Sequence, residues 1–181
     1  MKKRMEEKTN KTIDTVYRTY VHDLFSYALN LGFDREIAMD AIHDVFYTLC
    51  LDKDLLNHVI HIRFYLLRSL KNRLLNLHKQ KKEVTELPPE GSATEQEIPF
   101  SIHVTVEDLM IEAEEEEKIR QKVDQLLQNL TNRQREIIYL RYTMDCDYKE
   151  IAQLMHITVP ACRKLMHITL AKLKRNAVSA N

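Results

Sequence analysis

The stretch IAQLMHITVPACRKLMH, residues 151–167, constrains the fold of this chain more than any other segment. Apolar residues recur at helical spacing up to Met155 and resume beyond Pro160, with only a few residues between the two patterns. Thr158 is a favoured N-cap and proline is tolerated in the first turn of a helix, so the spacing predicts two short helices joined by a tight corner. His156 falls at that corner, where glycine usually supplies a positive φ and histidine is among the more frequent alternatives.

The second of these helices has two chemically different faces. Its expected core face carries Cys162, Leu165, Met166, Thr169, Leu170 and Leu173. Its expected outer face carries Val159, Pro160, Arg163, Lys164 and His167. Ala152 in the first helix is small enough for the second helix to cross close over it. This arrangement is a helix-turn-helix, in which the exposed N-terminal half of the second helix enters a DNA major groove.

Capping boxes predict where two earlier helices of this segment begin. Thr131 is followed three residues later by Gln134, and Asp147 is followed three residues later by Glu150. In each pair the first side chain accepts from the backbone of the third helical residue, whose own side chain reaches back to the cap. The C-terminal part of the chain is therefore expected to be a series of short, well-bounded helices.

The N-terminal part also has helical patterns, with Gly32 as an expected C-cap and Asp34 as an expected N-cap. The chain has only two glycines and four prolines, and no segment alternates apolar and polar residues as a strand would. The sequence therefore predicts an all-α fold. The expected apolar faces of three helices are Ile13, Val16, Tyr17, Tyr20, Val21, Leu24 and Ala28; Ile37, Ala38, Ala41, Ile42, Val45, Phe46 and Leu49; and Ile62, Leu66, Leu70, Leu74 and Leu77.

Charge divides the chain into three parts. Residues 1–82 contain 15 basic residues (Lys and Arg) and 10 acidic ones (Asp and Glu). Residues 83–117 contain 12 acidic residues and no basic ones, and residues 118–181 contain 12 basic and 5 acidic residues. Three of the four prolines lie in residues 83–99. We therefore expect two small helical domains, 1–82 and 107–181, joined by an acidic flexible linker over 83–106. The acidic segment is either a solvated spacer or an occupant of a cationic channel.

Two charged faces of the N-terminal helices are candidate binding surfaces. Asp40, His43 and Asp44 lie together on the face opposite the apolar one, which suits either a solvated surface or a basic partner. The helix after residue 62 is expected to present Arg63, Arg68, Lys71, Asn72 and Arg73, with Phe64 and Tyr65 at its start. Cations beside aromatic rings suit a single strand of nucleic acid, although such aromatics are more often core residues.

The cysteines and the N-terminus point to a cytoplasmic protein. Cys50, Cys146 and Cys162 form an odd set without paired spacing, which suits a reducing compartment, and we expect all three to be buried. The N-terminus has no apolar stretch of signal-peptide length, and no run of about 18 apolar residues exists for a membrane span. We therefore expect no direct membrane insertion.

Three segments carry a resemblance to a known family. The tract LLQNLTNRQREIIYLRYTMDCDYKEIAQLMHITVPACRKLMHITLAKLK resembles region 4 of bacterial RNA polymerase sigma factors. DREIAMDAIHDVFYTL resembles region 2.2, and YLLRSLKNRLLNLHKQKK resembles regions 2.3 to 2.4, in the same order along the chain. Regions 1 and 3 are missing, as in the extracytoplasmic-function group. Departures from the family pattern are His43 in place of Gln, His156 in place of the turn glycine, and Leu165 where a basic residue is frequent.

The resemblance implies a function in promoter-specific transcription initiation without catalysis by this chain. Region 2.2 would dock on core RNA polymerase through Asp40, His43 and Asp44. Regions 2.3 to 2.4 would capture the unpaired strand of the upstream-ten promoter element through Arg68, Lys71, Asn72 and Arg73. Region 4 would bind the upstream-thirty-five duplex through the outer face of its second helix, with Arg163 and Lys164 as the first candidates. The partners implied are core polymerase, promoter DNA and, as in many relatives, an anti-sigma factor.

Two other classes of protein are considered. A helix-turn-helix regulator that acts without polymerase would explain residues 118–181 but not the ordered match over 34–82. An enzyme or metal protein would have to use the eight histidines or three cysteines, yet His58 and His61 lack further ligands at recognised spacing. We therefore expect no metal site, no cofactor and no catalytic residues.

Overall fold

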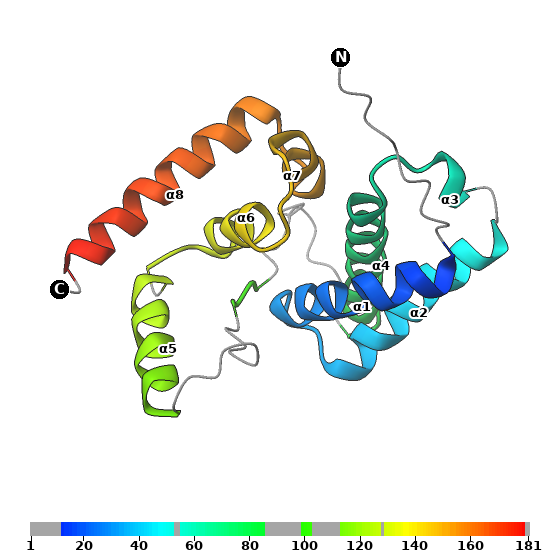
Figure 1. Cartoon of the computed structure of the whole chain (residues 1–181), viewed down its shortest axis with the longest axis horizontal. Coiled ribbons are helices and arrows are strands. Elements are labelled where there is room, and N and C mark those ends of the chain that lie inside the picture. Colours follow the sequence, from blue (N-terminus) through cyan, green and yellow to red (C-terminus); the bar gives the residue numbers. More distant parts are fainter. Residues whose placement is uncertain (1–11, 53–54, 86–98, 103–112, 128, 180–181) are drawn as a thin grey trace, which may run out of the picture.

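The computed structural model describes residues 12–52, 55–85, 99–102, 113–127 and 129–179, and these residues form helices and connecting turns without a strand. The all-α prediction is confirmed. The helices are α1 (Ile13–Asn30), α2 (Arg35–Leu51), α3 (Leu55–His58), α4 (Ile62–Thr85), α5 (Ala113–Leu127), α6 (Asn132–Tyr142), α7 (Tyr148–Leu154) and α8 (Val159–Ser179). Helices α1 to α4 lie on one side of the molecule and α5 to α8 on the other (Figure 1). We call these groups the N-terminal bundle and the C-terminal bundle.

In the N-terminal bundle, α1, α2 and α4 pack around one apolar core. The expected face of α2 is buried from Ala38 to Leu49, because its apolar residues recur at intervals of three and four. The face of α4 is buried at Leu66, Leu70 and Leu74, and Leu67 beside it is fully buried as well. Burial of adjacent positions on α4 means that this helix is covered on two sides.

Local capping signals set the helix boundaries as the sequence predicts. The Asp34 carboxylate accepts from the Ile37 N–H at 2.8 Å, and both predicted capping boxes are formed, at Thr131 with Gln134 and at Asp147 with Glu150. Backbone hydrogen bonding of Asp147 at its cap lowers the pKa of its carboxyl below the usual value. Gly32 follows α1 with φ of +82°, and an added Cβ would lie 3.0 Å from Pro99 Cγ.

The helix-turn-helix is formed by α7 and α8. His156 has φ of +52°, as expected for the corner, and the Ala161 N–H donates to Thr158 Oγ1 at 3.3 Å to cap α8. Ala152 of α7 is buried, and so are Cys162 and Met166 of α8, which packs against α7. Asp145, in the turn before α7, also has a positive φ, of +48°, which the sequence interpretation did not anticipate.

The left-handed backbone of His156 gives a stability prediction. The side chain is exposed, so backbone conformation dominates the effect of a substitution there. Since left-handed φ costs a non-glycine residue roughly 1–2 kcal/mol, we expect His156→Gly to preserve or raise the unfolding temperature and His156→Val to lower it. Thermal unfolding monitored by circular dichroism measures this. At His167, exposed within α8, the order should reverse because glycine weakens a helix interior; the same order at both positions would contradict the interpretation.

Several expectations about burial are wrong. Cys50 is exposed, because it lies on the solvent side of α2 next to buried Leu49. Leu170 is 41% exposed, because the C-terminal half of α8 extends beyond α6 and α7. Tyr27 is completely buried although it is outside the expected face of α1, because the C-terminal bundle covers that side.

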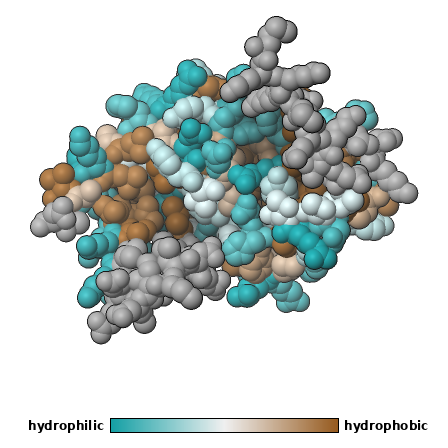
Figure 2. Space-filling model, viewed as in Figure 1, coloured by the Kyte–Doolittle hydropathy of each residue, from teal (hydrophilic) through white to brown (hydrophobic). Residues whose placement is uncertain are grey.

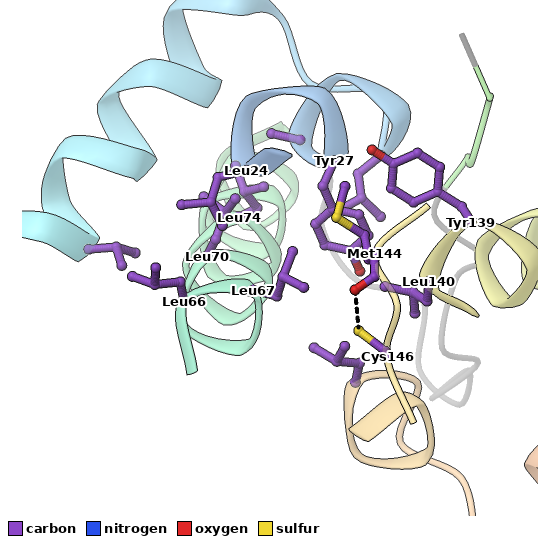
Figure 3. Packing of buried hydrophobic residues seen from close by; sticks show 14 of the residues in the cluster. Leu24, Tyr27, Leu66, Leu67, Leu70, Leu74, Tyr139, Leu140, Met144 and Cys146 are labelled. Atoms are coloured by element: carbon purple, nitrogen blue, oxygen red, sulfur yellow. Dashed lines mark hydrogen bonds between the residues drawn. The ribbon is translucent and has the colours of Figure 1, made fainter. Parts of the chain in front are cut away.

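The two bundles share a continuous buried cluster (Figure 3). Leu67 of α4 lies on the side that faces Leu140 and Met144 of the C-terminal bundle, and Tyr27 of α1 lies beside Tyr139 of α6. Phe100, which the sequence interpretation placed in the flexible linker, is only 1% exposed and contacts both tyrosines. Residues 99–102 of the expected linker are therefore ordered, while residues 86–98 and 103–112 lie outside the described part.

Candidate nucleic-acid interface

The N-terminal half of α8 presents cations to solvent. Arg163, Lys164, His167 and Pro160 are exposed, as predicted for the outer face of a recognition helix. Val159 differs, because it is half-buried and packs against the core rather than pointing outward. The exposed set therefore lies on one face of the N-terminal half of α8.

Tyr148 at the start of α7 supports this face. The Arg163 guanidinium lies 5.9 Å from the Tyr148 ring centroid, and the Arg141 guanidinium lies 5.6 Å from the same ring. Arg141 also donates to the Cys146 carbonyl at 2.9 Å, which fixes it on the turn before α7. A cation over an aromatic face is attracted by the ring quadrupole, so Arg163 is oriented while Lys164 is not. Sequence analysis missed this role of Tyr148, because the contact joins two helices.

The candidate strand-binding residues of α4 are separated by the structure. Arg68, Asn72 and Arg73 are exposed, whereas Lys71 is only 6% exposed. Arg68 and Asn72 are four residues apart and share a face of the helix, but Lys71 is turned toward the C-terminal bundle. The expectation that Lys71 is presented to solvent is therefore wrong for this arrangement of the two bundles.

Lys71 forms a buried ion pair with Glu136 of α6. The Lys71 Nζ donates to Glu136 Oε1 at 2.6 Å, and Tyr27 Oη donates to the same oxygen at 2.8 Å. Both donors come from the N-terminal bundle, and the acceptor comes from the C-terminal bundle. Burial raises the pKa of the Tyr27 hydroxyl well above its usual value, and the adjacent Glu136 carboxylate raises it further, so Tyr27 remains a hydrogen-bond donor.

The acidic face of α2 meets the cationic face of α4. Asp40, His43 and Asp44 are all exposed, as predicted. Asp44 forms an ion pair with Arg73, so the two candidate sets adjoin one another. Between α2 and α4 lies an open hollow of about 410 Å³ whose lining includes Asp44, Arg73 and two tyrosines, Tyr47 and Tyr65. The sequence interpretation named Tyr65 but did not anticipate the hollow.

Hydrophobic residues also reach the surface of the C-terminal bundle. In Figure 2 they gather over α5 and α8, whereas hydrophilic residues predominate elsewhere in that view. On α8 these residues are Ile168, Leu170 and Val178, which are 44%, 41% and 74% exposed. The Asn176 amide donates to the Leu126 carbonyl at 2.8 Å, which ties α8 to the end of α5.

Within the described ranges, no three His, Cys, Asp or Glu residues are grouped as metal ligands. Of the helices described, none combines the length and apolar character that crossing a membrane requires.

Three comparisons with known proteins agree with this geometry. The family described as Sigma-70, region 4 matches residues 120–173, which span α6, α7 and most of α8. The chain is 22% identical to the ECF RNA polymerase sigma factor SigM of Bacillus subtilis (strain 168) over 165 residues, covering 90% of this chain and 93% of that protein. Among solved structures, CnrH in complex with the cytosolic domain of CnrY matches with a TM-score of 0.54 at 17% identity, covering 96% of this chain and 92% of that one.

The helix-turn-helix of α7 and α8 lies within the segment that matches sigma-70 region 4, a domain of proteins of transcription initiation. The region 4 match and the similarity over nearly the whole chain to an extracytoplasmic-function (ECF) sigma factor support the resemblance to that group.

Proposed function

We propose that this protein binds core RNA polymerase in the cytoplasm and directs it to promoters, where the polymerase holoenzyme opens the DNA. The observation that carries the proposal is the presence of two exposed cationic faces on separate bundles, Arg163 and Lys164 on α8 and Arg68, Asn72 and Arg73 on α4. One face suits the major groove of a duplex, and the other suits the phosphates of an unpaired strand.

The two bundles divide this work. Residues 107–181 bind the upstream-thirty-five duplex, and residues 1–82 bind polymerase and the upstream-ten strand. Support comes from the helix-turn-helix geometry of α7 and α8, in which α8 presents Arg163 and Lys164 on an exposed face. The acidic segment over 83–106 connects them, and its charge suits passage through a cationic channel of the polymerase.

Asp40 is the residue that we assign most directly to polymerase docking. It is exposed on α2, whereas Asp44 is engaged with Arg73, so a change at Asp44 would alter the α4 face as well. An anti-sigma protein is a further proposed partner, because the similar CnrH was solved with the cytosolic domain of CnrY.

Asp40→Lys tests the docking assignment. Placing a like charge opposite a basic polymerase surface should weaken binding to core polymerase by at least about tenfold, since like-charge juxtaposition across an interface costs several kcal/mol. A titration of labelled protein with core polymerase measures the affinity, and run-off transcription measures the consequence. Asp14→Lys is the matched control, because Asp14 is an exposed carboxylate on α1 whose ion pair with Arg18 is also exposed and therefore contributes little to stability.

Equal affinities of the two variants would remove Asp40 from the polymerase interface. Failure of the unaltered protein to bind core polymerase, together with specific duplex binding on its own, would favour a regulator that acts without polymerase.

A further inference from the structure

Three cations among the described side chains of α4 are engaged by the C-terminal bundle. Lys71 is buried against Glu136, the Arg63 guanidinium donates to the Met144 carbonyl at 3.0 Å, and that of Arg68 donates to Gln153 Oε1 at 3.5 Å. Lys71 and Glu136 have side chains only 8% and 11% exposed. A lysine held in this way cannot neutralise a phosphate, because its ammonium group is out of reach of solvent and nucleic acid.

Phe100 lies in the segment that joins the two bundles, and it packs at the contact between them. Its ring lies 6.1 Å from that of Tyr27 and 5.6 Å from that of Tyr139. Its N–H donates to Asn132 Oδ1 at 3.2 Å, and its carbonyl accepts from the Arg135 guanidinium at 3.2 Å. The next residue is tied to the other bundle, since the Ser101 N–H donates to the Asn30 carbonyl at 2.8 Å.

We propose that Lys71, Glu136, Tyr27 and Phe100 form a latch that holds the two bundles in a closed form, in which Lys71 is withheld from the promoter strand. Opening of the latch separates the bundles and returns Lys71 to the exposed face of α4 with Arg68 and Asn72. This inference rests on the proposed function for its consequence, the release of a strand-binding lysine, but the latch itself is a property of the isolated chain.

The chemistry of the latch suits a reversible switch. A buried ion pair gains attraction but loses hydration, so its net contribution to closure is small while both partners are present. Loss of the Glu136 charge penalises only the closed form, in which Lys71 would remain buried without a counter-ion. Phe100 contributes apolar burial that exists only when the bundles are together, so shortening it also favours opening.

Cys146 reports on opening without reference to DNA. It is 2% exposed in the turn between α6 and α7, on the side of the C-terminal bundle that faces α4 (Figure 3). Burial, with a smaller contribution from the Glu150 carboxylate, raises the pKa of its thiol to about 12, so the closed form holds little reactive thiolate. Exposed Cys50 and buried Cys162, which lies within α8, serve as fast and slow references in the same molecule.

The experiment labels the full chain with a thiol reagent and follows each cysteine by mass spectrometry. We expect Cys146 to be labelled at least tenfold faster in Glu136→Gln and in Phe100→Ala than in the unaltered protein, while the labelling rate of Cys162 stays unchanged. The glutamine of Glu136→Gln keeps an acceptor for Tyr27. Glu36→Gln is the matched control, because it removes the same charge from an exposed position on α2. Small-angle scattering of the same samples should show a larger radius of gyration for both latch variants.

Unchanged Cys146 labelling and an unchanged radius in both variants would overturn the latch. Equal acceleration at Cys146 and Cys162 would also overturn it, because the C-terminal bundle would then be unfolding rather than separating. Binding of a single-stranded oligonucleotide tests the proposed function separately from the latch. Opening should raise the affinity for the oligonucleotide several-fold. Phe100→Ala is the clearer variant for this measurement, because it leaves the net charge unaltered. Faster Cys146 labelling without a gain in strand affinity would confirm the latch and reject α4 as the strand site.

Discussion

Leu70→Ala is expected to lower the free energy of unfolding of the N-terminal bundle by about 2–5 kcal/mol, the usual cost of a leucine-sized cavity in a core. Leu70 is fully buried at the centre of α4, between Leu66 and Leu74, where α1 and α2 both pack against that helix. The loss is large because a small domain has a total stability of only about 5–15 kcal/mol. Urea unfolding monitored by circular dichroism measures it.

Leu51→Ala is the matched control for this cavity. Leu51 ends α2 and is 70% exposed, so removal of the same atoms creates no cavity and should change stability by less than about 0.5 kcal/mol. Comparable losses in the two variants would mean that the core is not organised around α4.

Arg163→Ala and Lys164→Ala are expected to weaken binding to the upstream-thirty-five duplex in different ways. A residue that contacts a base should cost about 1–3 kcal/mol at one base position and relax specificity there, whereas a phosphate contact should weaken all duplexes and reduce the salt slope by about one unit. Arg163, held over the Tyr148 ring, is the more restrained of the two, and we expect it to be the base reader. Lys164 is expected to contact phosphate.

Asn72→Ala provides the contrast, because Asn72 is exposed on α4 of the other bundle. It should leave duplex affinity unchanged but reduce strand opening, which permanganate footprinting of holoenzyme on one promoter detects. Loss of duplex affinity in Asn72→Ala, with retention in both α8 variants, would contradict the proposed division of work between the bundles.

Side chains outside the sequence-predicted sets contribute to both candidate faces. Tyr148 contacts Arg163, and Glu136 holds Lys71 in a buried ion pair. Glu136 lies in the stretch RQRE that carries the resemblance to region 4, but nothing in that resemblance pairs it with α4. Carboxylates are seldom buried unpaired, but the burial of Glu136 that calls for a partner is seen only in the structure.

Local structure follows from the sequence alone. The caps at Asp34, Thr131 and Asp147 start helices where predicted, and His156 turns the helix-turn-helix corner with positive φ. Each of these depends on residues within four positions of one another, whose spacing and side-chain chemistry are visible in the sequence. The recognition helix is therefore specified with its exposed Arg163 and Lys164 before any tertiary contact is known.

Contacts between distant segments required the tertiary structure. Lys71 and Asn72 are adjacent in the sequence, yet one is buried and the other exposed, because successive helix positions point in directions about 100° apart and the C-terminal bundle covers only one of them. The partners of Glu136 lie 65 and 109 residues away in the chain. Helical periodicity determines which residues share a face, but the identity of the neighbour that covers that face is decided only by how the two bundles pack.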